Sequence, residues 1–356
     1  MQRRILGRTG ISVSNFALGA MMLGKMGNSD HDDAVRIIHR ALDAGINVID
    51  TADMYSAGES EEIVGKAIKH RRDDVVVATK VHHLMGADPN EGGNSRRWIT
   101  RAVEGSLRRL GTDHIDLYQI HRPDPTTDID ETLSVLTDLV HQGKVRTIGT
   151  STFPAEQIVE AQWSAQQHGY QRFRTEQPPY SILARGIEAA VLPTAQKYGM
   201  GVLTWGPLSS GWLSGRHSTG IDTTAGRSAV EPSKFDPTLA INAHKLEIVR
   251  QLEAVAAQAG LSLRHLALGF ALEHPAVTSV IIGPRTMEQL DDLIGAADIA
   301  LDTDTLDRID EIVAPGVDVN AAESYYVPES LSVPSLRRRA SAPTRHRPDG
   351  TLLAAR

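Results

Sequence analysis

The amino-acid sequence predicts an α/β fold, a (β/α)8 barrel of the TIM type. Eight short apolar runs are spread along the chain, and a stretch with helical periodicity follows each of them. The runs are almost continuously apolar, as in VVVATKV and SVIIG, which is typical of parallel strands buried on both faces. No change of composition divides the first 331 of the 356 residues, so a single barrel accounts for them.

The predicted strands are spaced so that a helix fits between each strand and the next. A hairpin-like segment at the N-terminus is expected to precede the barrel. The eight strands are Val13–Met21, Asn47–Ala52, Val75–Val81, Ile115–His121, Val145–Thr150, Phe173–Gln177, Gly201–Gly206 and Ser279–Gly283.

Helix boundaries are marked by capping residues. The helix predicted over Asp32–Ala44 ends at Gly45, a glycine placed to follow a helix C-terminus. Asp128 and Glu131 form the pattern of a capping box, and Thr286 and Gln289 form a second one after the last strand. A doubly wound open sheet is the structural alternative, but it usually has a glycine-rich first turn, and no G-x-G-x-x-G occurs near the first strand.

The charge distribution divides the chain into two parts. Residues 332–356 hold six arginines and one aspartate, with little apolar surface, and we predict a disordered tail there. The whole chain has a net charge of −7, so residues 1–331, which we assign to the barrel and its C-terminal loop, carry −12. Nucleic-acid binding by this acidic part is not expected. For the tail two interpretations stay open: it binds nucleic acid or an acidic partner, or it is merely solvated.

The absence of cysteine points to an intracellular protein. It excludes disulfides, thiolate metal sites and cysteine nucleophiles, and we expect a cytoplasmic location. No run of 18 apolar residues occurs, so no membrane association is predicted.

Four polar residues stand at or just after the ends of three consecutive predicted strands, where the active sites of such barrels form. They are Asp50, Tyr55, Lys80 and His121. Each alone has an ordinary explanation as a turn residue, a strand end or a structural histidine. Together they suit carbonyl reduction, because an ammonium paired with a carboxylate stabilises the ionised form of a phenol, and an imidazole beside it can orient a carbonyl oxygen.

Other chemistries lack their motifs. H-E-x-x-H is absent, the adjacent histidines at 82 and 83 are weak support for a metal, and we expect no metal site. There is no phosphate-binding P-loop and no G-x-S-x-G elbow.

At these residues the sequence resembles the aldo-keto reductases, over roughly residues 3–315. The matching pieces are GINVIDTADMY (45–55), VVVATK (75–80), LGTDHIDLYQIHRPD (110–124), GKVRTIGTS (143–151), GPLSSGWLSGR (206–216) and VIIGPRTMEQL (280–290). The resemblance implies a catalytic tetrad of Asp50, Tyr55, Lys80 and His121, in which Tyr55 is the general acid.

The resemblance also implies NADPH as cofactor, bound across the barrel mouth without a Rossmann motif. Ser151, Thr152 and Gln177 then lie at the nicotinamide carboxamide, although Thr152 replaces a common asparagine, and Trp205 stacks on the ring. Other positions implied for the cofactor are Pro207, Leu208, Ser209, Gly211, Gly283, Arg285 and Gln289. Arg285 also precedes a predicted helix start, where a guanidinium and free backbone N–H groups meet a phosphate together.

The function this implies is NADPH-dependent reduction of an aldehyde or ketone to an alcohol, with Tyr55 as the acid. The alternative is a regulatory or sensor protein that keeps the barrel and the cofactor, as the potassium-channel β subunits of this family do. The partner is a small-molecule carbonyl compound whose identity the sequence does not give, and a homo-oligomer stays open. Trp98, Trp212, Tyr325 and Tyr326, in or beside long loops, are candidates for lining its pocket.

Overall fold

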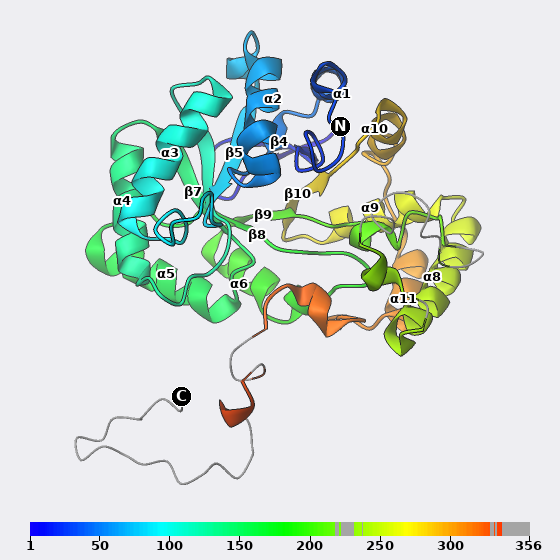
Figure 1. The fold of residues 1–356 in the computed structure, drawn as a ribbon. Helices are drawn as coiled ribbons and strands as arrows, with labels where there is room; N and C mark the ends of the chain where they lie inside the picture. The colour runs from blue at the N-terminus through cyan, green and yellow to red at the C-terminus, as the bar shows by residue number, and fades with distance from the viewer. Residues whose placement is uncertain (218–220, 222–230, 237, 328–330, 332, 337–356) are drawn as a thin grey trace.

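Eight parallel strands close into a barrel in the computed structural model, which describes residues 1–217, 221, 231–236, 238–327, 331 and 333–336 (Figure 1). Each strand pairs with the next along the chain, and the last pairs with both the ring's seventh strand and its first, which confirms the predicted fold. The strands are β3 (Phe16–Gly19), β4 (Val48–Asp50), β5 (Val76–Val81), β6 (Ile115–Ile120), β7 (Val145–Ser151), β8 (Thr175–Gln177), β9 (Gly201–Thr204) and β10 (Val277–Ile282).

Helices surround this ring in Figure 1. Their apolar faces and the outward faces of the strands form the larger hydrophobic core, to which nearly every strand and helix contributes. The helices are α1 (His31–Asp43), α2 (Glu59–Ile68), α3 (Arg96–Leu110), α4 (Ile129–His141), α5 (Ala155–His168), α6 (Val191–Tyr198), α8 (Ala240–Gln258), α9 (Leu263–Glu273), α10 (Met287–Ile294) and α11 (Thr303–Ile312).

An N-terminal hairpin closes one end of the barrel, as predicted. Its strands β1 (Arg3–Ile5) and β2 (Ser12–Ser14) pair antiparallel, and Leu6 and Val13 join the small core inside the ring. Gly7 between them has φ +55°, and a Cβ there would lie 2.7 Å from the carbonyl oxygen of Arg174, so only glycine fits. Because the hairpin leads directly into β3, it lies at the N-terminal ends of the strands, and the opposite end is left for a site.

The first predicted strand, Val13–Met21, is two strands in the structure. The apolar run is interrupted at Asn15, whose side chain donates to the carbonyl of Ala297 and whose backbone N–H bonds to Gln2. Residues before Asn15 belong to the hairpin and residues after it to the barrel. The polar residue marks the point where the chain passes from one sheet to the other.

The structure shows some of the predicted helix-capping interactions and lacks others. Gly45 has φ +94° directly after α1, as expected. The capping box at Asp128 is wrong: the Asp128 side chain makes no cap bond, and the Glu131 side chain instead lies 3.9 Å from Arg96. Thr286 does cap α10 by accepting from the N–H of Gln289 at 3.3 Å, but the Gln289 side chain accepts from the backbone of Arg285.

The boundary at residue 331 stays a prediction, because most of the tail, residues 332 and 337–356, lies outside the described residues. Within the described chain no single helix is long and apolar enough to cross a membrane. Only α8 and α9 taken together, bent by 87°, reach that length and apolarity.

Candidate active site

The four tetrad residues come together at the C-terminal ends of adjacent strands. Asp50 ends β4, Lys80 lies near the end of β5, and His121 follows β6 directly. Tyr55 begins a short 3₁₀ turn, Tyr55–Gly58, that leads from β4 into α2. The barrel register therefore brings together four residues that are spread over 72 positions of the sequence.

Lys80 is fully buried and is held by three oxygen atoms. Its Nζ lies 2.5 Å from Asp50 Oδ1, 2.7 Å from the carbonyl oxygen of Thr51, and 3.4 Å from the hydroxyl of Tyr55. Burial lowers the pKa of Lys80, but attraction to Asp50 and Tyr55 outweighs it and leaves the pKa above its ordinary value. The ammonium is therefore charged at neutral pH and lies against the phenol.

The carboxylate of Asp50 is fixed from the other side by two amides. Gln177 donates to Asp50 Oδ2 at 2.7 Å, and Gln119 donates to the same oxygen at 3.3 Å. With Lys80 on Oδ1, both oxygens are used, so the lysine has a rigid, hydrogen-bonded partner in a buried setting.

Tyr55 keeps its proton at neutral pH. Burial raises the pKa of the phenol, and the nearby ammonium of Lys80 offsets only part of that rise. The phenol is thus a neutral O–H donor facing a cation that would stabilise the phenolate formed when the proton leaves.

His121 is a buried, neutral imidazole. Its ring meets that of Tyr55 edge-on at 5.8 Å between centroids, and that of His83 at 4.7 Å. Burial, aided by the charge of Lys80, lowers the pKa of His121 well below its ordinary value. A neutral imidazole can donate one hydrogen bond to a substrate oxygen without carrying charge.

The turn that carries Tyr55 is strained. Ser56 and Ala57 have φ values of +50° and +57°, a region that costs non-glycine residues roughly 1 kcal/mol or more. Two reciprocal bonds hold Ser56 there: its hydroxyl accepts from the N–H of Met26 at 3.1 Å, and its own N–H faces the Met26 sulfur at 3.4 Å. The loop after β3 therefore fixes the turn that positions the phenol.

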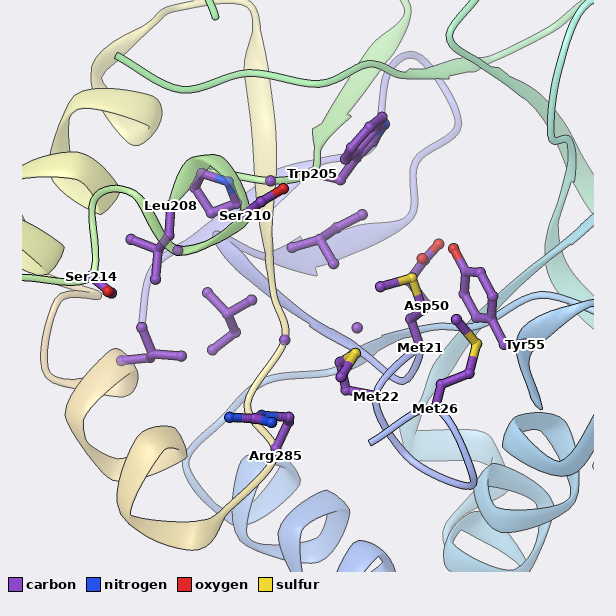
Figure 2. A pocket seen from close by; sticks show the side chains of 18 of the residues that line it. Met21, Met22, Met26, Asp50, Tyr55, Trp205, Leu208, Ser210, Ser214 and Arg285 are labelled. Atoms are coloured by element: carbon purple, nitrogen blue, oxygen red, sulfur yellow. The ribbon is translucent and has the colours of Figure 1, made fainter. Parts of the chain in front are cut away.

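A cavity of about 790 Å³ opens at the tetrad and extends along the barrel mouth (Figure 2). Asp50, Tyr55 and His121 line it, while Lys80 lies beneath them. Of the residues that resemblance assigns to a cofactor, the cavity is lined by Ser151, Gln177, Trp205, Pro207, Leu208, Gly211, Gly283, Arg285 and Gln289.

Thr152 and Ser209 do not line this cavity. The hydroxyl of Thr152 accepts from Arg122 at 3.0 Å, and that of Ser209 turns toward Glu323 at 3.3 Å. The neighbouring Ser210 faces the cavity in place of Ser209 (Figure 2).

The cavity wall near the tetrad offers a flat aromatic ring with a hydrogen-bonding amide beside it. The indole of Trp205 is fixed by a 3.2 Å bond from its N–H to the carbonyl of Gln177 and by the edge of the Tyr325 ring at 4.7 Å. The amide nitrogen of Gln177 is taken by Asp50, so its amide oxygen is the atom that can receive a bond from a ligand.

Comparison with known proteins identifies the fold family. A model of the Aldo/keto reductase family matches residues 15–314.

The chain belongs to the aldo/keto reductase family.

Its relatives in this family cover nearly its whole length. An oxidoreductase of Bacillus subtilis (strain 168), YrpG, described as uncharacterized, is 38% identical over 337 residues, which span 91% of this chain and 99% of YrpG. The aldo-keto reductase YhdN of the same organism is 38% identical over 300 residues, 82% and 88% of the two chains. A probable voltage-gated potassium channel subunit beta of Oryza sativa subsp. japonica is 35% identical over 320 residues, 88% and 97%.

Several lining residues of this aldo/keto reductase were not singled out from the sequence. Met21, Met22 and Met26 lie beside Asp50 and Tyr55 in Figure 2, and Met54 lines the same region. These methionines come from the loops after β3 and β4, where scattered apolar residues give no periodic signal.

Two polar residues were not predicted to line the cavity, although both adjoin tetrad strands. Arg122 follows His121 directly, and His83 lies three residues after Lys80. Burial and the neighbouring positive groups lower the pKa of His83 to about 4, so it too is neutral.

Of the four candidate aromatic residues, Tyr325 alone lines the cavity. Trp98 and Trp212 are packed in the core, with 5% and 1% of their surface exposed. Among the residues that the structure describes, no group of three or more histidine or acidic side chains is arranged to hold a metal ion.

Proposed function

We propose that this protein reduces aldehydes or ketones to alcohols with NADPH. The observation that carries the proposal is the contact chain from Asp50 through the buried ammonium of Lys80 to the protonated hydroxyl of Tyr55, which opens on the cavity. A neutral phenol backed by a fixed cation is suited to give a proton to an oxygen that is becoming an alkoxide.

The residues along the cavity fit a nicotinamide dinucleotide. The indole of Trp205 offers a ring face near the tetrad, and Ser151 and Gln177 offer polar atoms beside it. The guanidinium of Arg285, for which the described residues supply no acidic partner, precedes the N-terminus of α10 (Figure 2). A 2′-phosphate would meet positive charge there, which favours NADPH over NADH.

A reduced nicotinamide, when bound, would supply the hydride for the carbonyl carbon. The chain's own groups act on the oxygen: Tyr55 gives its proton, and Lys80 stabilises the phenolate left behind. His121 donates a hydrogen bond that orients the oxygen toward the phenol, while Asp50 keeps the ammonium in place.

The test is the variant Tyr55→Phe. Loss of the acid should lower kcat on a simple aldehyde by 10²–10⁴-fold, roughly 3–5 kcal/mol of barrier, with the Kd for NADPH little changed because the ring is retained. A Phe variant that keeps more than about a tenth of the wild-type rate would exclude Tyr55 as the acid.

A regulatory role is the second candidate, favoured by the relatives named as potassium channel β subunits in plants and fission yeast. In that case NADPH binds and carbonyl turnover is negligible with every aldehyde of a broad panel. Steady NADPH oxidation that depends on Tyr55 supports the enzyme instead. A cytoplasmic location and assembly into a homo-oligomer stay predictions.

A further inference from the structure

Arg122 is a half-buried guanidinium in the wall of the active-site cavity. Only its Nη1 bonds to the described protein: it donates to the carbonyl of His121 at 2.6 Å, and it lies 3.0 Å from the hydroxyl oxygen of Thr152 and 3.4 Å from that of Ser151. A guanidinium carries five N–H donors in a planar fork. The donors on Nε and Nη2 therefore lack protein acceptors in the described chain.

No carboxylate lies within 4 Å of Arg122 among the described residues. Two other half-buried arginines are paired with carboxylates, Arg109 with Glu61 at 2.7 Å and Arg72 with Asp116 at 2.7 Å. A guanidinium taken partly out of water without a partner is costly, and such groups are usually balanced by an anion.

The carboxyl group that acts on Arg122 from inside the barrel is Glu176, and it supplies little charge. It is fully buried and bonds to the hydroxyl of Thr150 at 2.5 Å and to the N–H of Phe153 at 3.1 Å. Burial raises the pKa of Glu176 to about 7, so the carboxyl group is ionised less readily than an exposed glutamate. The positive charge of Arg122 is thus left largely for the cavity.

The positive charge of Arg122 lies in the same cavity as the two side chains that we propose act on the substrate oxygen. The guanidinium carbon lies 6.0 Å from the ring centroid of Trp205, and Arg122 shares the cavity with Tyr55 and His121. We propose that Arg122 binds a carboxylate of the substrate, so that the preferred substrates are short oxo acids whose carbonyl lies next to the carboxylate. This rests on the proposed function and adds its substrate class.

The reaction stays balanced with such a substrate. The carbonyl carbon accepts a hydride from the reduced nicotinamide, the oxygen accepts the proton of Tyr55, and the oxo acid becomes a hydroxy acid with its carboxylate unchanged. Nε and Nη2 would meet the two carboxylate oxygens side by side, a geometry that arginine provides and lysine does not.

The test compares phenylglyoxylate with its neutral methyl ester, which share the same carbonyl and ring. The full chain with NADPH should have a higher kcat/KM for the acid. Arg122→Gln should lower kcat/KM for the acid at least tenfold more than for the ester, chiefly through KM. Arg122→Lys, which keeps the charge without the fork, should fall between.

Two measurements separate a loss of substrate binding from a loss of folding or of cofactor binding. Melting temperature and the Kd for NADPH show whether Arg122→Gln is folded and loaded. Arg101→Gln, which removes an exposed arginine paired with Glu91 on the surface, is the matched control and should behave as wild type.

Equal losses for acid and ester, a weakened Kd for NADPH that explains them, or a wild type without preference for the acid would overturn the proposal. Reduction of neutral aldehydes but not of the oxo acid would overturn it while leaving the proposed function standing. Failure to reduce any carbonyl compound would refute the proposed function itself.

Discussion

Replacing Asp53 by asparagine should stabilise the folded protein increasingly as the pH rises. Asp53 follows β4 with 1% of its surface exposed, and neither carboxyl oxygen has a hydrogen-bond partner among the described residues. Burial, together with repulsion from the buried Glu61, raises the pKa of Asp53 from 3.8 to about 8. The folded state therefore holds a proton that the unfolded state releases near pH 4.

The sign and size follow from linkage. A carboxyl group whose pKa is raised in the folded state gives its full stability below pH 4, and that stability is lost as the pH rises toward 8. At 1.36 kcal/mol per unit of pKa, the loss is ~1.7 kcal/mol at pH 5 and ~5.3 kcal/mol at pH 8, where the folded group is half ionised. Asparagine does not ionise, so the variant does not suffer this loss. The free energy of unfolding of Asp53→Asn minus that of wild type should therefore increase by ~4 kcal/mol between pH 5 and 8.

The assay is urea unfolding at half-unit steps from pH 5 to pH 9, with the exposed Asp73→Asn as the control. Asp73→Asn should track wild type at every pH. If the difference between Asp53→Asn and wild type stays constant within ~1 kcal/mol over this range, Asp53 is ionised in the folded protein and the reasoning fails.

Three further predictions follow from the site and its supports. Lys80→Met should lower kcat on a simple aldehyde by about 10²-fold or more, because the phenol loses the ammonium 3.4 Å away; wild-type kinetics would show that Lys80 merely ends its strand. The wild type should prefer NADPH over NADH at least roughly tenfold in kcat/KM, since charge-assisted bonds contribute ~1.5–3 kcal/mol each. Arg285→Ala should erase most of this preference by raising KM for NADPH. Equal wild-type kcat/KM values for both cofactors would contradict this. Glu323→Gln should destabilise by ~3–5 kcal/mol in urea unfolding because it strips the buried Lys245 of its partner, and adding Lys245→Met should restore part of the loss; a single variant as stable as wild type would argue against the pair.

Sequence patterns predicted the barrel because its strands are buried on both faces. The strands Val76–Val81 and Val277–Ile282 are mostly apolar and are buried at almost every position, so the sequence marks them without any knowledge of the strands they pair with. The switch from hairpin to barrel at Asn15 was missed, since it depends on a bond to Ala297, far along the chain. The capping box at Asp128 also failed: the Asp128 side chain makes no cap bond, and the Glu131 side chain lies 3.9 Å from Arg96 of a neighbouring helix.

The placement of the candidate residues was predictable where they stand at strand ends and less so elsewhere, while their catalytic roles stay predictions. Strand ends fix the side chains of Asp50 and Lys80, and the structure brings them to 2.5 Å. The positions of the four lining methionines depend on loop conformation. The lack of a carboxylate partner for Arg122 within the described residues depends on which acidic groups the fold brings near it. Sequence alone places Arg122 beside His121, but it does not show that no carboxylate of the described residues reaches it.

Closure of the barrel has a consequence for synthesis of the chain. The ring is complete only when β10 pairs with β3, which joins Val280 to Phe16. While the ribosome still holds residues 277–282, β3 and β9 each present an unpaired strand edge, the kind of edge that pairs with other chains. Nascent or truncated chains that end before β10 are therefore the forms of this protein that we expect to aggregate and to need chaperones.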